Sequence, residues 1–244
     1  MTSDVAIFGA GAWGTALAVH LVARSAHPRS VVLWTRSSDH AEALRRTREN
    51  ARYLGGFTLP AALTITADLH VASHARTLIV ATPIAALVDV VDAIAATGAT
   101  APLAWLSKGF VCDNGLRSGV GLAHQLIAPR WPSPVGVISG PSFAEEVARG
   151  LPTALVAASA QRAFARDLAT LVRGVTLRSY DSDDVAGVEV GGAIKNVLAI
   201  AAGLSDGLRF GHNARAALIT RGIAEHDVRN LLAAVRTLLA SSPG

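Results

Sequence analysis

Near its N-terminus the chain carries Val5-Ala6-Ile7-Phe8-Gly9-Ala10-Gly11-Ala12-Trp13-Gly14, and this stretch decides the fold. Four apolar residues typical of a buried strand run directly into G-x-G-x-x-G, and a helical pattern follows from Ala12 to Arg24. Gly9 permits a tight turn, Gly11 leaves the backbone open to a pyrophosphate, and Gly14 lets the helix pack closely on the strand. The free amides at the helix N-terminus would face the phosphates. The pattern predicts the first turn of a dinucleotide-binding sheet.

Short apolar runs typical of strands alternate with helical patterns as far as about residue 180. Beyond the first, the expected strands are Ser30–Thr35, Leu63–Thr66, Thr77–Ala81, Leu103–Leu106, Val135–Ser139 and Thr153–Ala157. Helical stretches separate most of them, which predicts a mostly parallel sheet with helices on both faces. From Asp184 onward no strand is evident, and two or three helices follow. We therefore expect a Rossmann-like, doubly wound α/β domain over residues 1–183 and an all-helical, truncated domain over residues 184–244.

The composition bounds the class of protein. Of 244 residues 51% are hydrophobic and only 5% aromatic, which predicts a folded chain with an aliphatic core. A single cysteine, Cys112, excludes an internal disulfide or a multi-cysteine zinc site, and the eight histidines form no HExxH pattern. No metal site is therefore expected. Charges interrupt every long apolar run and the N-terminus lacks the pattern of a signal peptide, so we expect no membrane span and a cytoplasmic protein.

The basic residues are almost all arginines. The formal charge is +4, and the densest group, Arg45, Arg46, Arg48 and Arg52, is expected to form one solvated helix face. No nucleic-acid-binding module accompanies this charge, which fits small anionic ligands better than nucleic acid. Of 22 basic side chains only Lys108 and Lys195 are lysines. A lysine kept under such a bias indicates either chance or a need for a compact ammonium that can lose its proton.

The end of the second expected strand bears on the choice of cofactor. NAD-selective sites usually place Asp or Glu there, but this strand is followed by Thr35-Arg36-Ser37-Ser38. The guanidinium of Arg36 matches a 2′-phosphate, so NADP is favoured, and NAD stays an open alternative. Asp39 is expected to cap the next helix as part of the Ser/Asp cluster. Trp13 can either cover the dinucleotide or serve ordinary packing.

Several longer strings occur further along the chain. They are Trp105-Leu106-Ser107-Lys108-Gly109, Ser139-Gly140-Pro141-Ser142-Phe143-Ala144, Gly187-Val188-Glu189-Val190-Gly191-Gly192-Ala193-Ile194-Lys195-Asn196, Ser205-Asp206-Gly207 and the run from Asn213 to Gly222. With the glycine loop and Asn50…Tyr53-Leu54, they closely resemble bacterial NAD(P)-dependent glycerol-3-phosphate dehydrogenase. The resemblance extends from about residue 4 to Glu225.

The resemblance implies an oxidoreductase that reversibly reduces dihydroxyacetone phosphate to sn-glycerol 3-phosphate, a precursor for phospholipid synthesis. It implies that Lys195 exchanges the proton and that Lys108 contacts both cofactor and substrate. It further implies substrate contacts at Gly140 and Ser142. The implied cofactor contacts are Ala144, Ala12, Trp13 and Arg36, in addition to the glycines of the loop.

The residues themselves agree with parts of this assignment. Lys195 stands among Val, Ile, Ala and Gly, so desolvation is expected to lower its pKa towards that of a general acid–base. Gly191 and Gly192, one turn earlier, would let a ligand reach it, although tight helix packing is an alternative reason for them. Ser142 and Glu145 form an S-x-x-E pattern, which predicts a capped helix starting just after Ser142. Lys108 follows a strand, at the edge where open α/β sheets bind ligands.

After Glu225 the resemblance stops, and residues 226–244 show no counterpart of the family's Ser-Arg-Asn string. The missing helices would leave apolar surface on the helix that carries Lys195, which favours self-association, for example as a homodimer. Two interpretations stay open: a working dehydrogenase, and an inactive truncated remnant that still binds the dinucleotide. A dehydrogenase of similar build acting on another 2-hydroxy compound is a third.

Overall fold

The computed structural model describes residues 2–112 and 119–224, and the side chains as far as residue 220. The chain divides into two compact units, Met1–Glu189 and Val190–Gly244. The division falls inside helix α8 (Val185–Gly207), a few residues after the predicted boundary at residues 183 and 184. That predicted boundary stays a prediction.

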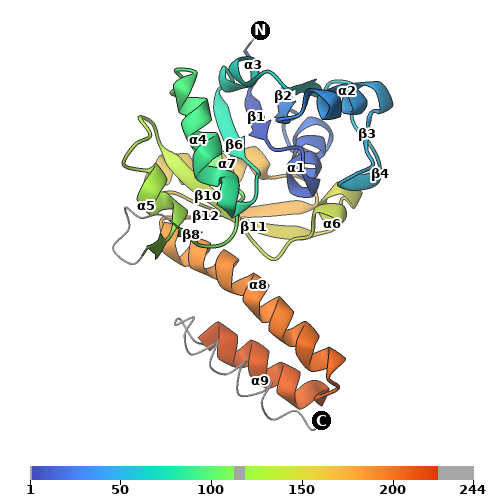
Figure 1. Cartoon of the computed structure of the whole chain (residues 1–244), viewed down its shortest axis with the longest axis vertical. Helices are drawn as coiled ribbons and strands as arrows, with labels where there is room; N and C mark the ends of the chain where they lie inside the picture. Colours follow the sequence, from blue (N-terminus) through green and yellow to red (C-terminus); the bar gives the residue numbers. More distant parts are fainter. Residues whose placement is uncertain (1, 113–118, 225–244) are drawn as a thin grey trace. The chain divides into compact units, whose positions relative to one another are not determined.

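The first unit is built on an eight-stranded sheet (Figure 1). In spatial order its strands are β12 (Leu177–Ser182), β11 (Thr153–Ala158), β10 (Val135–Ser139), β7 (Leu103–Trp105), β6 (Thr77–Val80), β1 (Val5–Phe8), β2 (Val31–Trp34) and β5 (Thr64–Thr66). All neighbours are parallel except β10 and β11, which are antiparallel. Two small ribbons, β3 (Glu49–Asn50) with β4 (Leu54–Thr58) and β8 (Val111–Cys112) with β9 (Val120–Gly121), lie outside this sheet. The predicted doubly wound, mostly parallel sheet is confirmed.

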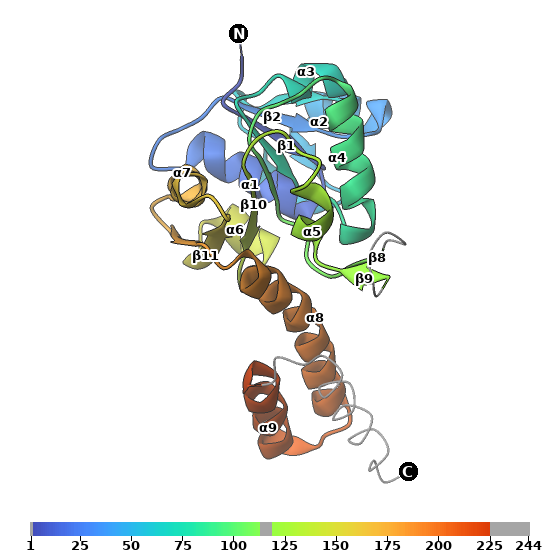
Figure 2. The ribbon, with the colours of Figure 1, turned by 90° about the vertical axis from the view of Figure 1, so that its left-hand side faces the viewer.

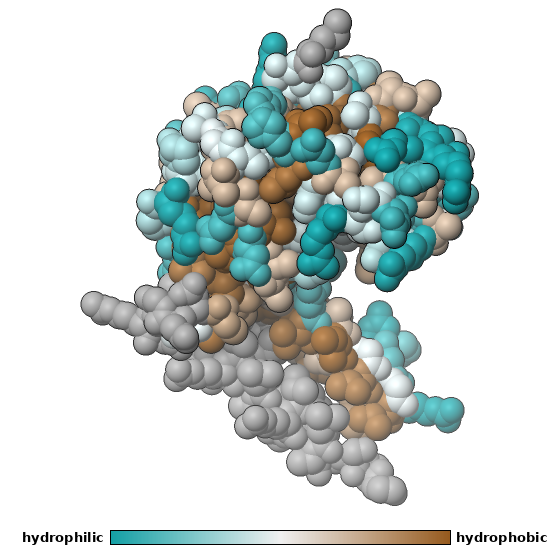
Figure 3. Space-filling view, turned by 45° about the horizontal axis from the view of Figure 1, so that its top comes forward, coloured by the Kyte–Doolittle hydropathy of each residue, from teal (hydrophilic) through white to brown (hydrophobic). Residues whose placement is uncertain are grey.

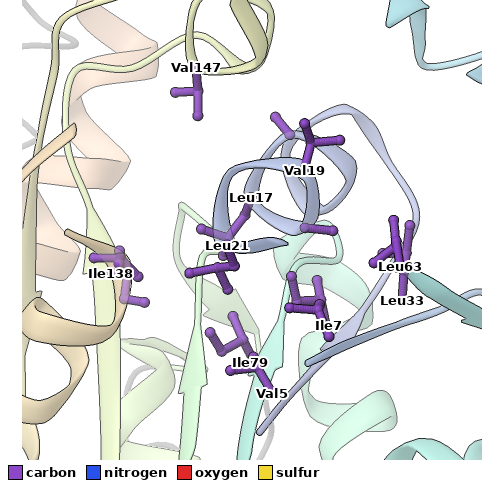
Figure 4. Close-up of a cluster of buried hydrophobic side chains, with 14 of the residues drawn as sticks. Val5, Ile7, Leu17, Val19, Leu21, Leu33, Leu63, Ile79, Ile138 and Val147 are labelled. Carbon is purple, nitrogen blue, oxygen red and sulfur yellow. The ribbon is translucent and has the colours of Figure 1, made fainter. Parts of the chain in front are cut away.

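Strand β1 shows why this sheet is covered on both faces. Successive side chains of a strand point to opposite faces of the sheet, and all four residues of β1 are buried, so both faces are covered. Val5 and Ile7 belong to one apolar cluster, which Figure 4 shows with Leu17 and Leu21 of α1 (Ala12–Ala23). Ala6 and Phe8 belong to a second cluster on the other face. The continuous apolar run Val5–Phe8 therefore correctly predicts a central strand.

Helices cover each face, and Figure 2 shows α1 and α4 on opposite sides of the strands. The first cluster takes side chains from α1, α2 (Ser38–Thr47), α6 (Ala144–Arg149) and α7 (Arg162–Val172). The second takes them from α3 (Leu69–Ser73), α4 (Leu87–Ala96) and α5 (Ala123–Ile127). A short 3-10 turn (Ile84–Ala86) precedes α4.

Two sequence expectations need correction. The sequence does not predict β12, because this edge strand alternates buried and exposed residues and carries polar side chains at its end. The arginine group is not one solvated helix face. Arg48 lies just after α2 in the left-handed region (φ 51°), and its guanidinium donates to the carbonyls of Pro60 and Leu63. Arg45 donates to the carbonyl of Ile65, so much of the charge fastens the chain around β5.

The second unit contains the remainder of α8 and helix α9 (Gly211–Ala224), with an ion pair between Asp206 and Arg215. Exposed apolar side chains gather on α8, including Ile200 and Leu204, and appear as a brown strip in Figure 3. By length and composition alone α8 is apolar enough to cross a membrane. Core helices of soluble proteins pass the same test, so this is weak evidence.

Candidate cofactor and substrate site

The glycine loop is shaped by two close contacts and one open position. Gly9 has a φ of 122°, and a Cβ there would lie 2.8 Å from the carbonyl oxygen of Ala81. A Cβ on Gly14 would clash with the carbonyl oxygen of Gly9, so this glycine lets α1 approach the loop itself. At Gly11 no described atom lies within 4 Å of where a Cβ would be. The loop thus leaves open space in front of the first amides of α1, which suits a pyrophosphate.

The turn after β2 places Arg36 on the surface, two residues after Trp34, the last residue of the strand. Ser37 is the N-cap of α2, because its hydroxyl accepts a hydrogen bond from the backbone amide of His40 at 3.2 Å. Asp39 already lies within the first helical turn, so the expectation that it caps the helix is wrong. Its carboxylate still suits the positive end of the helix.

Lys108 and the loop between β10 and α6 meet at the edge of the sheet. The Nζ of Lys108 donates to the carbonyl oxygen of Gly140 at 2.9 Å. Gly140 is confined by β11, since a Cβ there would lie 2.6 Å from the carbonyl oxygen of Ala154. The indole Nε1 of Trp13 donates to the carbonyl oxygen of Ser142 at 3.4 Å. Three segments far apart in the sequence, around residues 13, 108 and 140, therefore adjoin one another.

The predicted capping box at Ser142 is wrong. Helix α6 begins at Ala144 with Phe143 as its N-cap, and no side chain caps it. The hydroxyl of Ser142 instead donates to the carbonyl oxygen of Gly140 at 3.3 Å, and Glu145 pairs with Arg149. Ser142 is buried, so it braces the loop that Lys108 also contacts. Ala144 is the first residue of α6.

The sequence analysis assigns no individual role to two buried polar residues of the first unit. Asn50 donates from its side chain to the carbonyl oxygen of Ala10 at 2.9 Å, in the middle of the glycine loop. Glu189 accepts from Trp105 Nε1 at 3.1 Å and from the backbone amide of His124 at 3.2 Å. Its second oxygen lies 2.5 Å from Nδ1 of His124. The signal for Glu189 was available, because an acid between Val188 and Val190 in an apolar helix needs partners.

Lys195 belongs to the second unit, where it is half-buried on α8, six residues after Glu189. Apart from its chain neighbours and the backbone of its own helix, no described atom lies within 4 Å of a Cβ placed on Gly191, one turn earlier. The first unit thus gathers the glycine loop, Trp13, Lys108, Gly140 and Ser142, while Lys195 is carried by the other unit. Among the described residues no group of three or more His, Cys, Asp or Glu side chains could hold a metal ion.

Comparison with known families decides the assignment. The model of the NAD-dependent glycerol-3-phosphate dehydrogenase N-terminus matches residues 4–165, and that of the C-terminus matches residues 184–240. The chain belongs to this family. The C-terminal family model extends past Glu225 to residue 240, whereas the bacterial relatives below cover about 91% of the chain, which fits a resemblance that ends near Glu225; residues 225–240 lie outside the described part.

Its relatives are glycerol-3-phosphate dehydrogenases of bacteria. The [NAD(P)+] enzyme of Variovorax paradoxus is 53% identical over 229 residues, covering 91% of this chain and 66% of the relative. That of Thiobacillus denitrificans is 51% identical, with 90% and 65% covered. The crystal structure of glycerol-3-phosphate dehydrogenase from Coxiella burnetii superposes with a TM-score of 0.81 at 40% identity, covering 91% of this chain and 67% of that one. The chain thus spans about two thirds of the length of these curated relatives.

Proposed function

We propose that this chain reversibly reduces dihydroxyacetone phosphate to sn-glycerol 3-phosphate with NADPH or NADH. The observation that carries the proposal is the contact between Lys108 Nζ and the Gly140 carbonyl, beside the glycine loop. It joins a loop built for a dinucleotide to a cation suited to a phosphorylated substrate, at the edge where such sheets bind ligands. Arg36, exposed after β2, favours NADP over NAD, because its guanidinium suits the 2′-phosphate that only NADP carries.

The reaction adds a hydride to the carbonyl carbon and a proton to the carbonyl oxygen of the substrate. The nicotinamide, when bound, supplies the hydride. We assign the proton to the ammonium of Lys195, which becomes a neutral amine and is reprotonated from solvent. Lys108 provides a fixed positive charge that favours the substrate phosphate and the developing alkoxide. Gly140 and Ser142 hold the loop that contacts the substrate, and Ala144 begins the helix beside it.

The proposed setting of this chemistry is the cytoplasm, where the product enters phospholipid synthesis. The exposed apolar side chains of α8, such as Ile200 and Leu204, support association with a second copy of the chain. Analytical sedimentation at increasing protein concentration measures this self-association, and a homodimer is the expected result. No nucleic-acid partner is proposed.

The experiment that tests the proposal is a steady-state assay with dihydroxyacetone phosphate and NADPH, run beside a binding titration of NADPH. A working dehydrogenase oxidises NADPH only when the substrate is present. Lys195→Ala should abolish this turnover and leave NADPH affinity nearly unchanged. The alternative is an inactive protein that still binds the dinucleotide. It predicts NADPH binding with no turnover in either protein, and this result would refute the enzymatic proposal.

A further inference from the structure

Asn50 is a buried amide that fastens the middle of the glycine loop. Only 1% of the residue is exposed. Its Nδ2 donates to the carbonyl oxygen of Ala10 at 2.9 Å and to the hydroxyl of Thr15 at 2.8 Å. Ala10 lies between the two glycines of the loop, and Thr15 is fully buried in the first turns of α1. One side chain therefore holds the loop and the start of its helix together.

These two bonds fix the roles of the neighbouring atoms. Turning the amide over would set Oδ1 against the carbonyl oxygen of Ala10, where two acceptors repel each other. Oδ1 therefore faces Nε2 of His40, 3.3 Å away, and Nε2 carries the hydrogen. In the neutral ring Nδ1 is then an acceptor, and it receives the hydroxyl of Thr35 at 3.2 Å.

His40 thereby holds both neighbours of Arg36 in the sequence. Its ring binds Thr35, and its backbone amide donates to the hydroxyl of Ser37 at 3.2 Å. Thr35 is buried while Arg36 is exposed, so the turn presents the guanidinium from a fixed base. The ring of Tyr53 packs edge-on against His40, with centroids 5.6 Å apart, which further restricts the imidazole.

We propose that His40 and Asn50 form a bridge that couples the two ends of the dinucleotide site, and that His40 determines selectivity for a 2′-phosphate. The inference rests on the proposed function, because it takes the ligand to be NADP(H) or NAD(H). Asn50 acts on the loop that faces the pyrophosphate, which both cofactors share. His40 acts on the turn that presents Arg36, which only the 2′-phosphate uses. A charged, two-pronged contact of this kind depends on how the guanidinium is oriented.

The test measures dissociation constants of NADPH and NADH for the full chain by titration, without reference to turnover. His40→Phe keeps a ring and removes both nitrogens. We expect it to weaken NADPH binding about tenfold and NADH binding by no more than about twofold, because the ring loses its hydrogen bond to Thr35 in the turn. Arg36→Ala should lose the same preference. Asn50→Ala should weaken both cofactors by a similar factor.

Two conservative replacements separate the two arms of the bridge. In His40→Asn the amide occupies the place of Nδ1 and can bind Thr35 but does not reach Asn50, so the preference for NADPH should be kept. In His40→Gln the amide occupies the place of Nε2 and can bind Asn50 but not Thr35, so the preference should fall. His27→Gln, at an exposed histidine on the loop before β2, is the matched control and should change neither constant. Thermal melts establish that each variant is folded.

The outcomes distinguish the two proposals. An unaltered ratio of NADH to NADPH dissociation constants in folded His40→Phe, or in Arg36→Ala, overturns the bridge while leaving the proposed function intact. Equal behaviour of His40→Asn and His40→Gln also overturns it. If the unaltered chain binds neither NADPH nor NADH, the proposed function fails, and the bridge fails with it.

Discussion

The carboxylate of Glu189 offers the most informative perturbation of stability. Its side chain is only 4% exposed and accepts hydrogen bonds from Trp105 and from the backbone amide of His124. Glu189→Ala leaves the fully buried Trp105 Nε1 without an acceptor, and each buried unpaired donor costs about 1–3 kcal/mol. With both donors affected, we expect a loss of about 3 kcal/mol in the free energy of unfolding. Glu189→Gln keeps an amide oxygen for Trp105, so its loss should be about 1 kcal/mol.

The assay is urea unfolding followed by tryptophan fluorescence. All four tryptophans precede residue 189, so the signal reports the first unit alone. For a unit of this size about 3 kcal/mol corresponds to roughly 6–12 °C in a thermal melt. Glu145→Ala is the matched control, because its carboxylate is 60% exposed in an ion pair worth at most about 1 kcal/mol. If Glu189→Ala and Glu145→Ala unfold at the same urea concentration, the reasoning is refuted.

Further predictions concern the glycine loop and a buried histidine. Gly14→Ala should destabilise the first unit and abolish NADPH binding. Gly11→Ala, with open space at its Cβ, should melt as the unaltered chain does but bind NADPH at least about tenfold more weakly. Thermal melts and cofactor titrations check both variants, and normal NADPH binding by Gly11→Ala would contradict the proposed pyrophosphate position. Burial lowers the pKa of His20, which therefore takes up its proton more readily when the chain is unfolded, so the free energy of unfolding should fall as the pH drops below about 6.5. His20→Gln can still donate to the carbonyl of Val172 but does not titrate, so it should flatten the pH dependence of the free energy of unfolding, measured by urea melts between about pH 7 and about pH 5. An unchanged slope would show that His20 is not the source of this pH dependence.

The sheet was predictable from the sequence because its signal is local. Val5–Phe8 and Val135–Ser139 match observed strands end to end, since central strands of a parallel sheet are continuous apolar runs. Strand β12 was not predictable in this way, because an edge strand needs only one buried face. The prediction that Ser142 caps α6 was wrong for a different reason. Ser142 is held in the loop that the Lys108 ammonium contacts, and so its hydroxyl faces Gly140 rather than the helix.

The candidate site was predictable only in part. Gly9, Gly11 and Gly14 follow from a strand–turn–helix pattern; the structure accounts sterically for Gly9 and Gly14, whereas Gly11 borders open space. The resemblance alone points to Gly140, whereas Lys108 is also indicated by the rarity of lysine and its place after a strand, and Ser142 by its S-x-x-E pattern; no spacing rule joins residues 108 and 140. Asn50 was seen only as part of a family string. Its contact with Ala10 spans forty residues and depends on tertiary packing, which single-sequence patterns do not record.

We propose that bound NADPH and sn-glycerol 3-phosphate protect both lysines of this chain, as the roles proposed for Lys108 and Lys195 require. Because Lys108 and Lys195 are the only lysines, an amine-acylating reagent followed by peptide mass spectrometry reports both at once. With NADPH and sn-glycerol 3-phosphate each present at about ten times their dissociation constants, we expect both lysines to be acylated roughly tenfold more slowly than in the free chain. Unchanged acylation of Lys108 and Lys195 when NADPH is demonstrably bound would contradict it.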